Sequence, residues 1–243
     1  GMKGYADDGY CSEGVGYYNY GFCAYILLRE EVYRATQGKI DFFQTPKFVR
    51  IARYGKKIQM NEGVCPAYSD CRIGLSPDKF ILSYCDRALG ITSAEEQPVL
   101  PKGNNLSLHL LELFTSQVAK VGMTDGIRQE ESDALRAYYE QAGILIARPA
   151  GGTSCRLAIS AKGGTNAENH NHNDVGSYAV ALGSETMVGD QGGPNSYPGD
   201  YFNGDAPQKY KIKGSFGHPV PVVDGRTQSS GGKAKGVVLQ KEF

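Results

Sequence analysis

The sequence predicts an α+β protein in which a helical half precedes a half built from short strands. Up to about residue 143, apolar residues recur at the three- and four-residue spacing of a helix face. Beyond it, short apolar or alternating runs are separated by Gly, Pro, Asn and Asp, which is typical of strands and turns. Because the two patterns are segregated along the chain, alternating βαβ units are not expected. We therefore expect two domains, one over residues 1–143 and one over residues 144–243.

Helix start and stop signals define the elements of the first half. An apolar stripe predicts a helix over residues 15–36, with Gly38 just beyond it. Thr45 and Pro46 form an N-cap followed by a first-turn proline, which predicts a helix over residues 45–53. Ser76 and Pro77 repeat this signal before a helix that ends at Gly90. Two further helices are expected, over residues 106–121 and 130–141.

Short runs bounded by turn residues define the elements of the second half. The expected strands cover residues 144–148, 156–160, 177–182, 186–188 and 220–223, with a last run over residues 236–243.

Composition excludes several classes of protein. The 243 residues include 26 basic and 26 acidic side chains, and this zero net charge argues against a general nucleic-acid or anionic-membrane surface. No apolar run approaches the roughly 20 residues that cross a bilayer, so no membrane span is expected. The six cysteines contain no C-x-x-C pair, which favours free thiols, with a Cys65–Cys71 bridge as the alternative.

Histidine is the most informative residue type, because only four are present and two fall in NHNHND at 169–174. In an extended segment His170 and His172 would face the same side, whereas the alternative is a polar turn. Asp190 ends a predicted strand, and His218 begins the next apolar run. Histidine and aspartate at strand ends supply nitrogen and oxygen ligands, the usual set for an open zinc site.

Together these motifs make the chain resemble the heparinase II/III-like polysaccharide lyases. The resemblance implies an incomplete (α/α) toroid joined to an antiparallel β-sandwich, with the active site in the cleft between them. It also implies that the chain begins inside the toroid and ends inside the sandwich, as part of a larger enzyme. The similar stretches are DGYCSEGVGY at 8–17, NHNHND at 169–174, MVGDQG at 187–192, YF at 201–202 and HPVPVVDGRTQ at 218–228.

The activity that this resemblance implies is cleavage of uronate-containing polysaccharides by β-elimination. A base removes the C5 proton, the uronate carboxylate is neutralised, and an acid protonates the leaving O4 oxygen. The expected enzyme is thus a carbon–oxygen lyase whose partner is an acidic polysaccharide, such as a glycosaminoglycan or an alginate-like polymer. That substrate class implies export to the periplasm or outside the cell.

The resemblance also assigns roles to individual residues. Tyr68, followed four residues later by Arg72, is similar to the toroid tyrosine and arginine of heparinase II, and His170 to the catalytic histidine. Asn173 and Asp174 are expected to orient the imidazoles. His172, Asp190 and His218 resemble the ligands of a structural zinc, and Tyr201, with Tyr197 as alternative, resembles the sandwich-side tyrosine.

One position departs from the family pattern. Glu13 stands at or near the place where the family commonly carries the His or Asn that neutralises the uronate. Glu13 is expected to be protonated, to support catalysis, to bind Arg72, or only to cap the following helix. Two other functions therefore stay open: a non-catalytic carbohydrate-binding protein on the same scaffold, and a hydrolytic zinc site.

Overall fold

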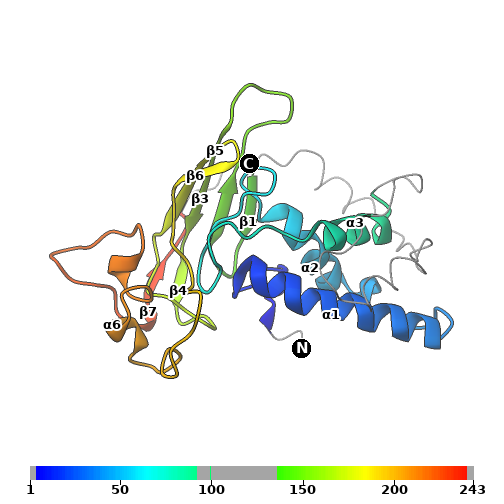
Figure 1. Cartoon of the computed structure of the whole chain (residues 1–243), viewed down its shortest axis with the longest axis horizontal. Coiled ribbons are helices and arrows are strands. Elements are labelled where there is room, and N and C mark those ends of the chain that lie inside the picture. The colour runs from blue at the N-terminus through cyan, green and yellow to red at the C-terminus, as the bar shows by residue number, and fades with distance from the viewer. Residues whose placement is uncertain (1–3, 92–98, 100–135, 240–243) are drawn as a thin grey trace.

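The three longer helices lie on one side of an antiparallel sheet in this protein (Figure 1). The computed structural model describes residues 4–91, 99 and 136–239. Within these ranges it contains four α-helices, a five-stranded antiparallel sheet and a two-stranded sheet. The predicted α+β class is therefore confirmed. The closed architectures, an incomplete toroid and a β-sandwich, stay predictions, as does the division into two domains at residue 143.

The longest helix, α1 (Gly14–Ala35), follows the predicted stripe. Val15, Tyr18, Phe22 and Ile26 recur every three or four residues and are fully buried. The helix ends where the backbone turns left-handed, with φ of 53° and 80° at the two residues after its C-cap. The predicted helix over residues 15–36 is thus confirmed to within one residue at each end.

Two shorter helices follow α1 in the described part of the helical half. The helix α2 (Pro46–Lys57) has Pro46 in its first turn as predicted, although the Thr45 side chain makes no capping hydrogen bond. The helix α3 (Lys79–Ala88) begins later than expected, because the Asp78 carboxylate accepts a hydrogen bond from the Phe80 amide at 2.8 Å and caps it. A single-turn helix, α6 (Ala206–Lys209), lies in the second half.

The main sheet has the order β1-β2-β3-β5-β6, and every neighbouring pair is antiparallel. The strands expected around residues 144–148, 156–160, 177–182 and 186–188 are confirmed as four of its members. The bounds are β1 Arg136–Tyr139, β2 Ile144–Ala147, β3 Leu157–Lys162, β5 Tyr178–Leu182 and β6 Glu185–Val188, and the second sheet pairs β4 Gly164–Asn166 with β7 Gly231–Gly236.

Three expected elements are corrected. The helix over residues 130–141 is wrong where the chain is described, because Ala137 and Tyr139 alternate inward with strand periodicity in β1. No strand forms over residues 220–223, where Pro219 and Pro221 lack the amide protons that a ladder needs. The last strand ends, rather than begins, at Gly236. The helix expected over residues 106–121 lies outside the described residues.

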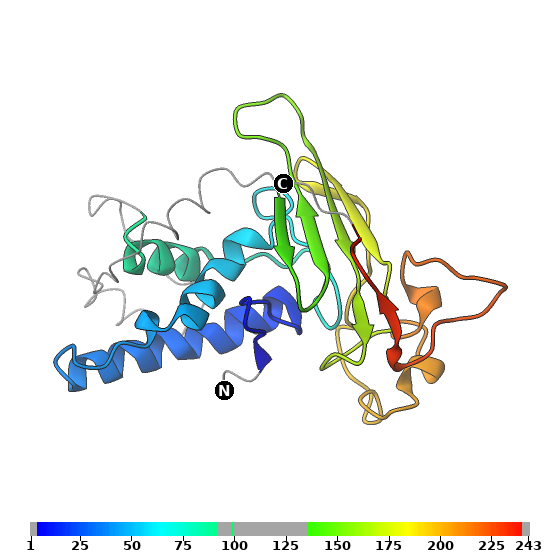
Figure 2. The same cartoon turned by 180° about the vertical axis from the view of Figure 1, so that it is seen from behind.

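The two faces of the main sheet have different surroundings. On the inner face, the Tyr139 ring lies 5.2 Å from the Tyr10 ring and 5.8 Å from the Tyr54 ring, measured between centroids. This face therefore shares one core with the helices, and α1 meets the sheet by its N-terminal end (Figure 2). The outer face is apolar and exposed: Leu157 and Leu182 are 49% and 45% accessible. No described helix is long and apolar enough to cross a membrane.

Candidate active site and metal centre

The functional residues gather where the loop between α2 and α3 meets the segment after β6. Contact is made by the main chain, since the Gly193 amide donates to the Cys71 carbonyl at 3.1 Å and Arg72 pairs with Gly192 in a β-bridge. A Cβ at Gly192 would lie 1.8 Å from the Cys71 oxygen, and its φ of +64° also favours glycine. This close approach brings residues 68–72 against Asp190.

Asp70 is the centre of the contacts across this junction. The carboxylate is 3% exposed and lies 2.6 Å from Nδ1 of His170 and 3.1 Å from Nε2 of His172. The Tyr201 hydroxyl donates to it at 3.5 Å. Burial acts to raise the pKa of Asp70, but the hydrogen bonds from His172 and His170 outweigh it and hold the pKa below its usual value. Asp70 is therefore an ionised acceptor shared by the two histidines.

The histidine segment is a turn and not an extended strand. His170 has a left-handed φ of 56°, so the polar-turn alternative is the one that the backbone adopts. The turn still directs both imidazoles to one carboxylate. Nε2 of His170 lies 3.8 Å from Oε2 of Glu13, beyond hydrogen-bonding distance, and the His170 ring lies 4.9 Å from that of Phe202. Because Asp70 engages Nδ1, Nε2 is the nitrogen of His170 that is left for a further partner.

Glu13 supports the histidine segment and does not cap α1. It occupies the N-cap position, but its side chain makes no capping hydrogen bond. Its carboxylate accepts a hydrogen bond from the Asn169 amide at 3.1 Å and faces His170. The capping role is therefore wrong, and the contacts of Glu13 in the described structure are with the histidine turn.

The predicted catalytic tyrosines are both buried. The hydroxyl of Tyr68 lies 2.8 Å from Oγ of Ser160 on β3, and that of Tyr201 lies 3.1 Å from Nε2 of His172. They are 2% and 1% exposed, and burial is the main cause that raises the pKa of each above its usual value. Tyr197 is 36% exposed, and its pKa is also raised by burial and by a hydrogen bond with Tyr17. Tyr197 is thus the accessible tyrosine of the three.

A cavity of about 320 Å³ opens between the first turns of α1 and the loops of the junction. Three tyrosines line it together with the charged side chains of Asp70 and Arg72. A larger cavity of about 740 Å³ lies between α2, α3 and the ends of the sheet hairpins, and neither Asp70 nor Arg72 lines it. The smaller cavity is therefore the better candidate for a substrate site. Its tyrosines are Tyr17, Tyr20 and Tyr197.

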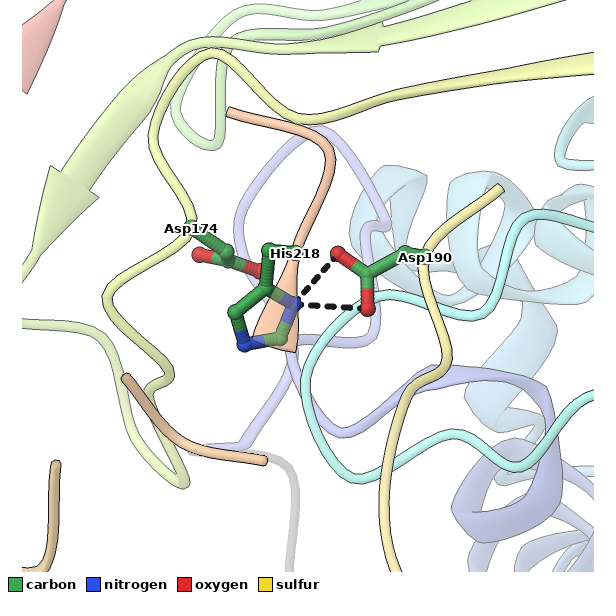
Figure 3. Close-up of side chains that lie close together, drawn as sticks. All are labelled: Asp174, Asp190 and His218. Carbon is green, nitrogen blue, oxygen red and sulfur yellow. Dashed lines mark hydrogen bonds and ion pairs between the residues drawn. The ribbon is translucent and has the colours of Figure 1, made fainter. Parts of the chain in front are cut away.

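The candidate metal centre lies behind this cavity. Asp174, Asp190 and His218 are buried, and one potential ligand atom from each lies within 4.8 Å of the others (Figure 3). Both carboxylate oxygens of Asp190 are 2.8 Å from Nδ1 of His218. The ring of His172 lies 5.2 Å from that of His218, between centroids. Two predicted ligands are thus in the cluster, Asp174 joins them, and His172 lies beside it.

Unsatisfied nitrogen atoms test whether this donor set fits a cation. Nδ1 of His172 and Nε2 of His218 are buried, and neither has a hydrogen-bond partner among the described residues. Burial is the largest influence on His172 and lowers its pKa, which favours the neutral imidazole that a metal requires. Asp174 is already paired with Lys162, whose ammonium lies 2.7 Å away. The cluster of Asp174, Asp190 and His218 thus offers the nitrogen and oxygen ligands of a divalent cation, and the unpaired Nδ1 of His172 lies beside it.

Sequence reasoning missed the carboxylate that orients the histidines. Asn173 donates to the Gln228 carbonyl at 3.1 Å and Asp174 binds Lys162, so neither makes the expected hydrogen bond to an imidazole. Asp70 does, although it lies 100 residues from His170. The only sequence signal was its position between Tyr68 and Arg72.

Comparison with known proteins shows a structural likeness. No family model matches the chain, and no curated protein matches it. Among solved structures, the chain is similar to a crystal structure of heparinase III, with a TM-score of 0.55 and 17% sequence identity. The match covers 98% of this chain and 35% of that one. The chain therefore shares a fold with part of heparinase III, and it spans about a third of that protein's length.

Proposed function

We propose that this chain carries the catalytic cleft of a polysaccharide lyase that acts on uronate-containing glycans by β-elimination. The observation that carries the proposal is the position of His170, which Asp70 holds through Nδ1 and whose ring lies 5.9 Å from that of Tyr17, a residue of the cavity wall. The fold likeness to heparinase III supports the same class of enzyme. An acidic polysaccharide as substrate, and export to the periplasm or outside the cell, belong to this proposal.

The elimination needs a base, a cation and an acid, and the cleft offers each. Nε2 of His170 takes the C5 proton, and the C–H electron pair forms the C4–C5 double bond as the C4–O4 bond breaks. Arg72, in the wall of the cavity, neutralises the uronate carboxylate while charge develops on it. The hydroxyl of Tyr197 protonates the leaving O4 oxygen, because its raised pKa keeps it protonated at neutral pH.

Tyr68, Tyr201 and Glu13 take other roles in this scheme. The raised pKa of Tyr68 keeps it protonated at neutral pH, so it offers no phenolate as a base, and its hydroxyl reaches substrate only after leaving Ser160. Catalysis by Tyr68 stays a prediction from the resemblance, to be tested against His170. Tyr201 supports His172, and Glu13 holds the turn that carries His170.

A structural zinc ion completes the proposal. His172, Asp190 and His218 would hold it behind the cleft, with Asp174 as a neighbouring carboxylate. A cation there would tie the histidine turn to the segments after β6 and before residue 219, and the elimination needs no water activated by it.

Ultraviolet absorbance of the unsaturated uronate product tests the proposal on heparan sulfate, hyaluronan and alginate. We expect turnover, and a fall in kcat of about 10²–10⁴-fold in His170→Ala. Tyr197→Phe should lose activity while the control Tyr178→Phe, on the outer face of the sheet, should not. If Tyr68→Phe lost activity while Tyr197→Phe kept full activity, Tyr68 and not Tyr197 would be the catalytic tyrosine. No product from any uronate with a folded chain would refute the lyase.

A second candidate is a protein that binds acidic carbohydrate without cleaving it. The observation in its favour is that the hydroxyls of Tyr68 and Tyr201 are buried and engaged, while Tyr17, Tyr20 and Tyr197 offer rings to the cavity. It is distinguished by glycan binding without product, unchanged in His170→Ala and weakened in Tyr20→Ala.

A further inference from the structure

Asp70 is a residue of the helical half whose hydrogen-bonding partners belong to the strand half. Its carboxylate accepts from His170 and His172, and Tyr201 lies at 3.5 Å. No backbone donor needs this carboxylate in the described contacts, so it serves no capping or turn role there. Its contacts are those of a residue that orients the imidazoles.

The two nitrogens of His172 have different surroundings. Nε2 faces Asp70 at 3.1 Å, and the Tyr201 hydroxyl lies at the same distance. Nδ1 is buried on the side of the ring away from Asp70 and has no partner among the described residues. A neutral imidazole carries one proton, and a carboxylate at Nε2 places that proton there, which leaves the Nδ1 lone pair free.

We propose that Asp70 is the positioning residue of the metal centre: it fixes His172 with the proton on Nε2, so that Nδ1 is presented to a cation shared with Asp190 and His218. This inference rests on the zinc site of the proposed function. A ligand imidazole commonly donates its second N–H to a carboxylate, and loss of that carboxylate weakens metal binding about 10–100-fold.

The same carboxylate links the cation to the cleft. Asp70 holds His170 by Nδ1 at 2.6 Å, and its loop is bound to the metal-ligand segment through Gly193 and Cys71. Asp190 itself accepts the Gly192 amide at 2.8 Å. A cation at His172 therefore also stabilises the docked loop and the orientation of His170.

Zinc affinity of the full chain tests the proposal, measured by competition with a chromophoric chelator. Asp70→Asn should weaken zinc binding about 10–100-fold. The control Asp86→Asn removes a carboxylate of the helical half that pairs with Lys56, and should leave affinity within about twofold. The rise in Tm on adding zinc should shrink in Asp70→Asn and persist in Asp86→Asn. Equal zinc affinity in Asp70→Asn and wild type would overturn the proposal, as would a folded wild-type chain that binds no zinc.

A second measurement does not depend on a variant that folds. Long-range ¹H–¹⁵N correlation spectra of the wild-type chain at pH 8 report the tautomer of His172. We expect the proton on Nε2, and a proton on Nδ1 would overturn the proposal. These experiments test the role of Asp70 separately from the lyase activity, because a chain without turnover can still lose zinc affinity in Asp70→Asn. If the chain is an active lyase and Asp70→Asn leaves its zinc affinity unchanged, only the role of Asp70 is refuted.

Discussion

Two buried clusters of charged side chains, one in the helical half and one at the junction, differ in how completely their polar atoms are used. In the helical half, Arg29 forms two 2.7 Å hydrogen bonds to Asp41 and one each to Tyr84 and Glu30, at 2.6 and 3.0 Å. Its guanidinium also lies 4.4 Å from the centre of the Phe43 ring. This cluster is satisfied by protein groups.

The junction cluster is built from equally buried residues but leaves ring nitrogens of His172 and His218 without partners among the described residues. An unsatisfied buried polar atom costs about 1–3 kcal/mol, so a fold retains it where a ligand restores the bond. The comparison teaches that burial of charge alone does not mark a functional site. The difference between these two clusters is that the junction leaves ring nitrogens without partners among the described residues, whereas the Arg29 cluster leaves no such atom.

The largest expected effect is on the satisfied cluster. Arg29→Met leaves Asp41 and Glu30 buried without their cation, and we expect a loss of about 3–5 kcal/mol in the free energy of unfolding. Urea denaturation measures this loss, which should be the same with zinc and with chelator. If the loss of unfolding free energy in Arg29→Met depended on zinc, the two clusters would not be energetically independent.

A smaller effect is expected at the backbone contact of the junction. Gly192→Ala forces a Cβ against the Cys71 carbonyl, and we expect a loss of about 3 kcal/mol in the free energy of unfolding, together with weaker zinc binding. The control is Gly63→Ala, which has a similar φ of +74° but no atom within 4 Å of the added Cβ. It should cost only about 1–2 kcal/mol, from backbone strain. Equal losses in both variants would show that the contact is looser than described.

The smallest effect concerns local unfolding of the junction and of the helical core, which the rates of thiol labelling measure. Burial raises the pKa of Cys71 at the junction and of Cys85 in the helical core above the usual 9.0, so both stay protonated at pH 8 and react only on opening. Stability from these raised values is present below pH 9 and is lost as the pH rises through the folded pKa. Exposed Cys155 should label first, then Cys71, then Cys85, and zinc should slow only Cys71. If zinc also slowed the labelling of Cys85, the junction and the helical core would not unfold independently.

The fold class and most element positions could be predicted because they follow local patterns. Helix α1 and four strands of the main sheet lie where spacing places them. The strand β1 was missed because residues 136–139 carry only two repeats of alternation, and pairing with β2 decides its conformation. Tertiary pairing of that kind has no local signature.

Some residues of the candidate site could also be predicted from local sequence and others could not. His218 stood out because histidine is rare here, and both His218 and Asp190 lie beside strand-like runs. Asp70 could not, since its partners lie 100 residues or more away and an aspartate in a loop is ordinary in sequence. The accessibility of Tyr197 relative to Tyr201 also required the fold, because both lie in one loop of Gly and Pro residues.

The main-chain contact at Gly192 and Gly193 has a mechanical consequence. A Cβ at Gly193 would lie 2.5 Å from the Asp70 carbonyl, so here the two halves touch without side chains between them. Separating the halves at this point breaks the Gly193–Cys71 hydrogen bond. The spacing of Asp70 and Asp190 is therefore set by the main chain, and it does not depend on how side chains at the junction repack.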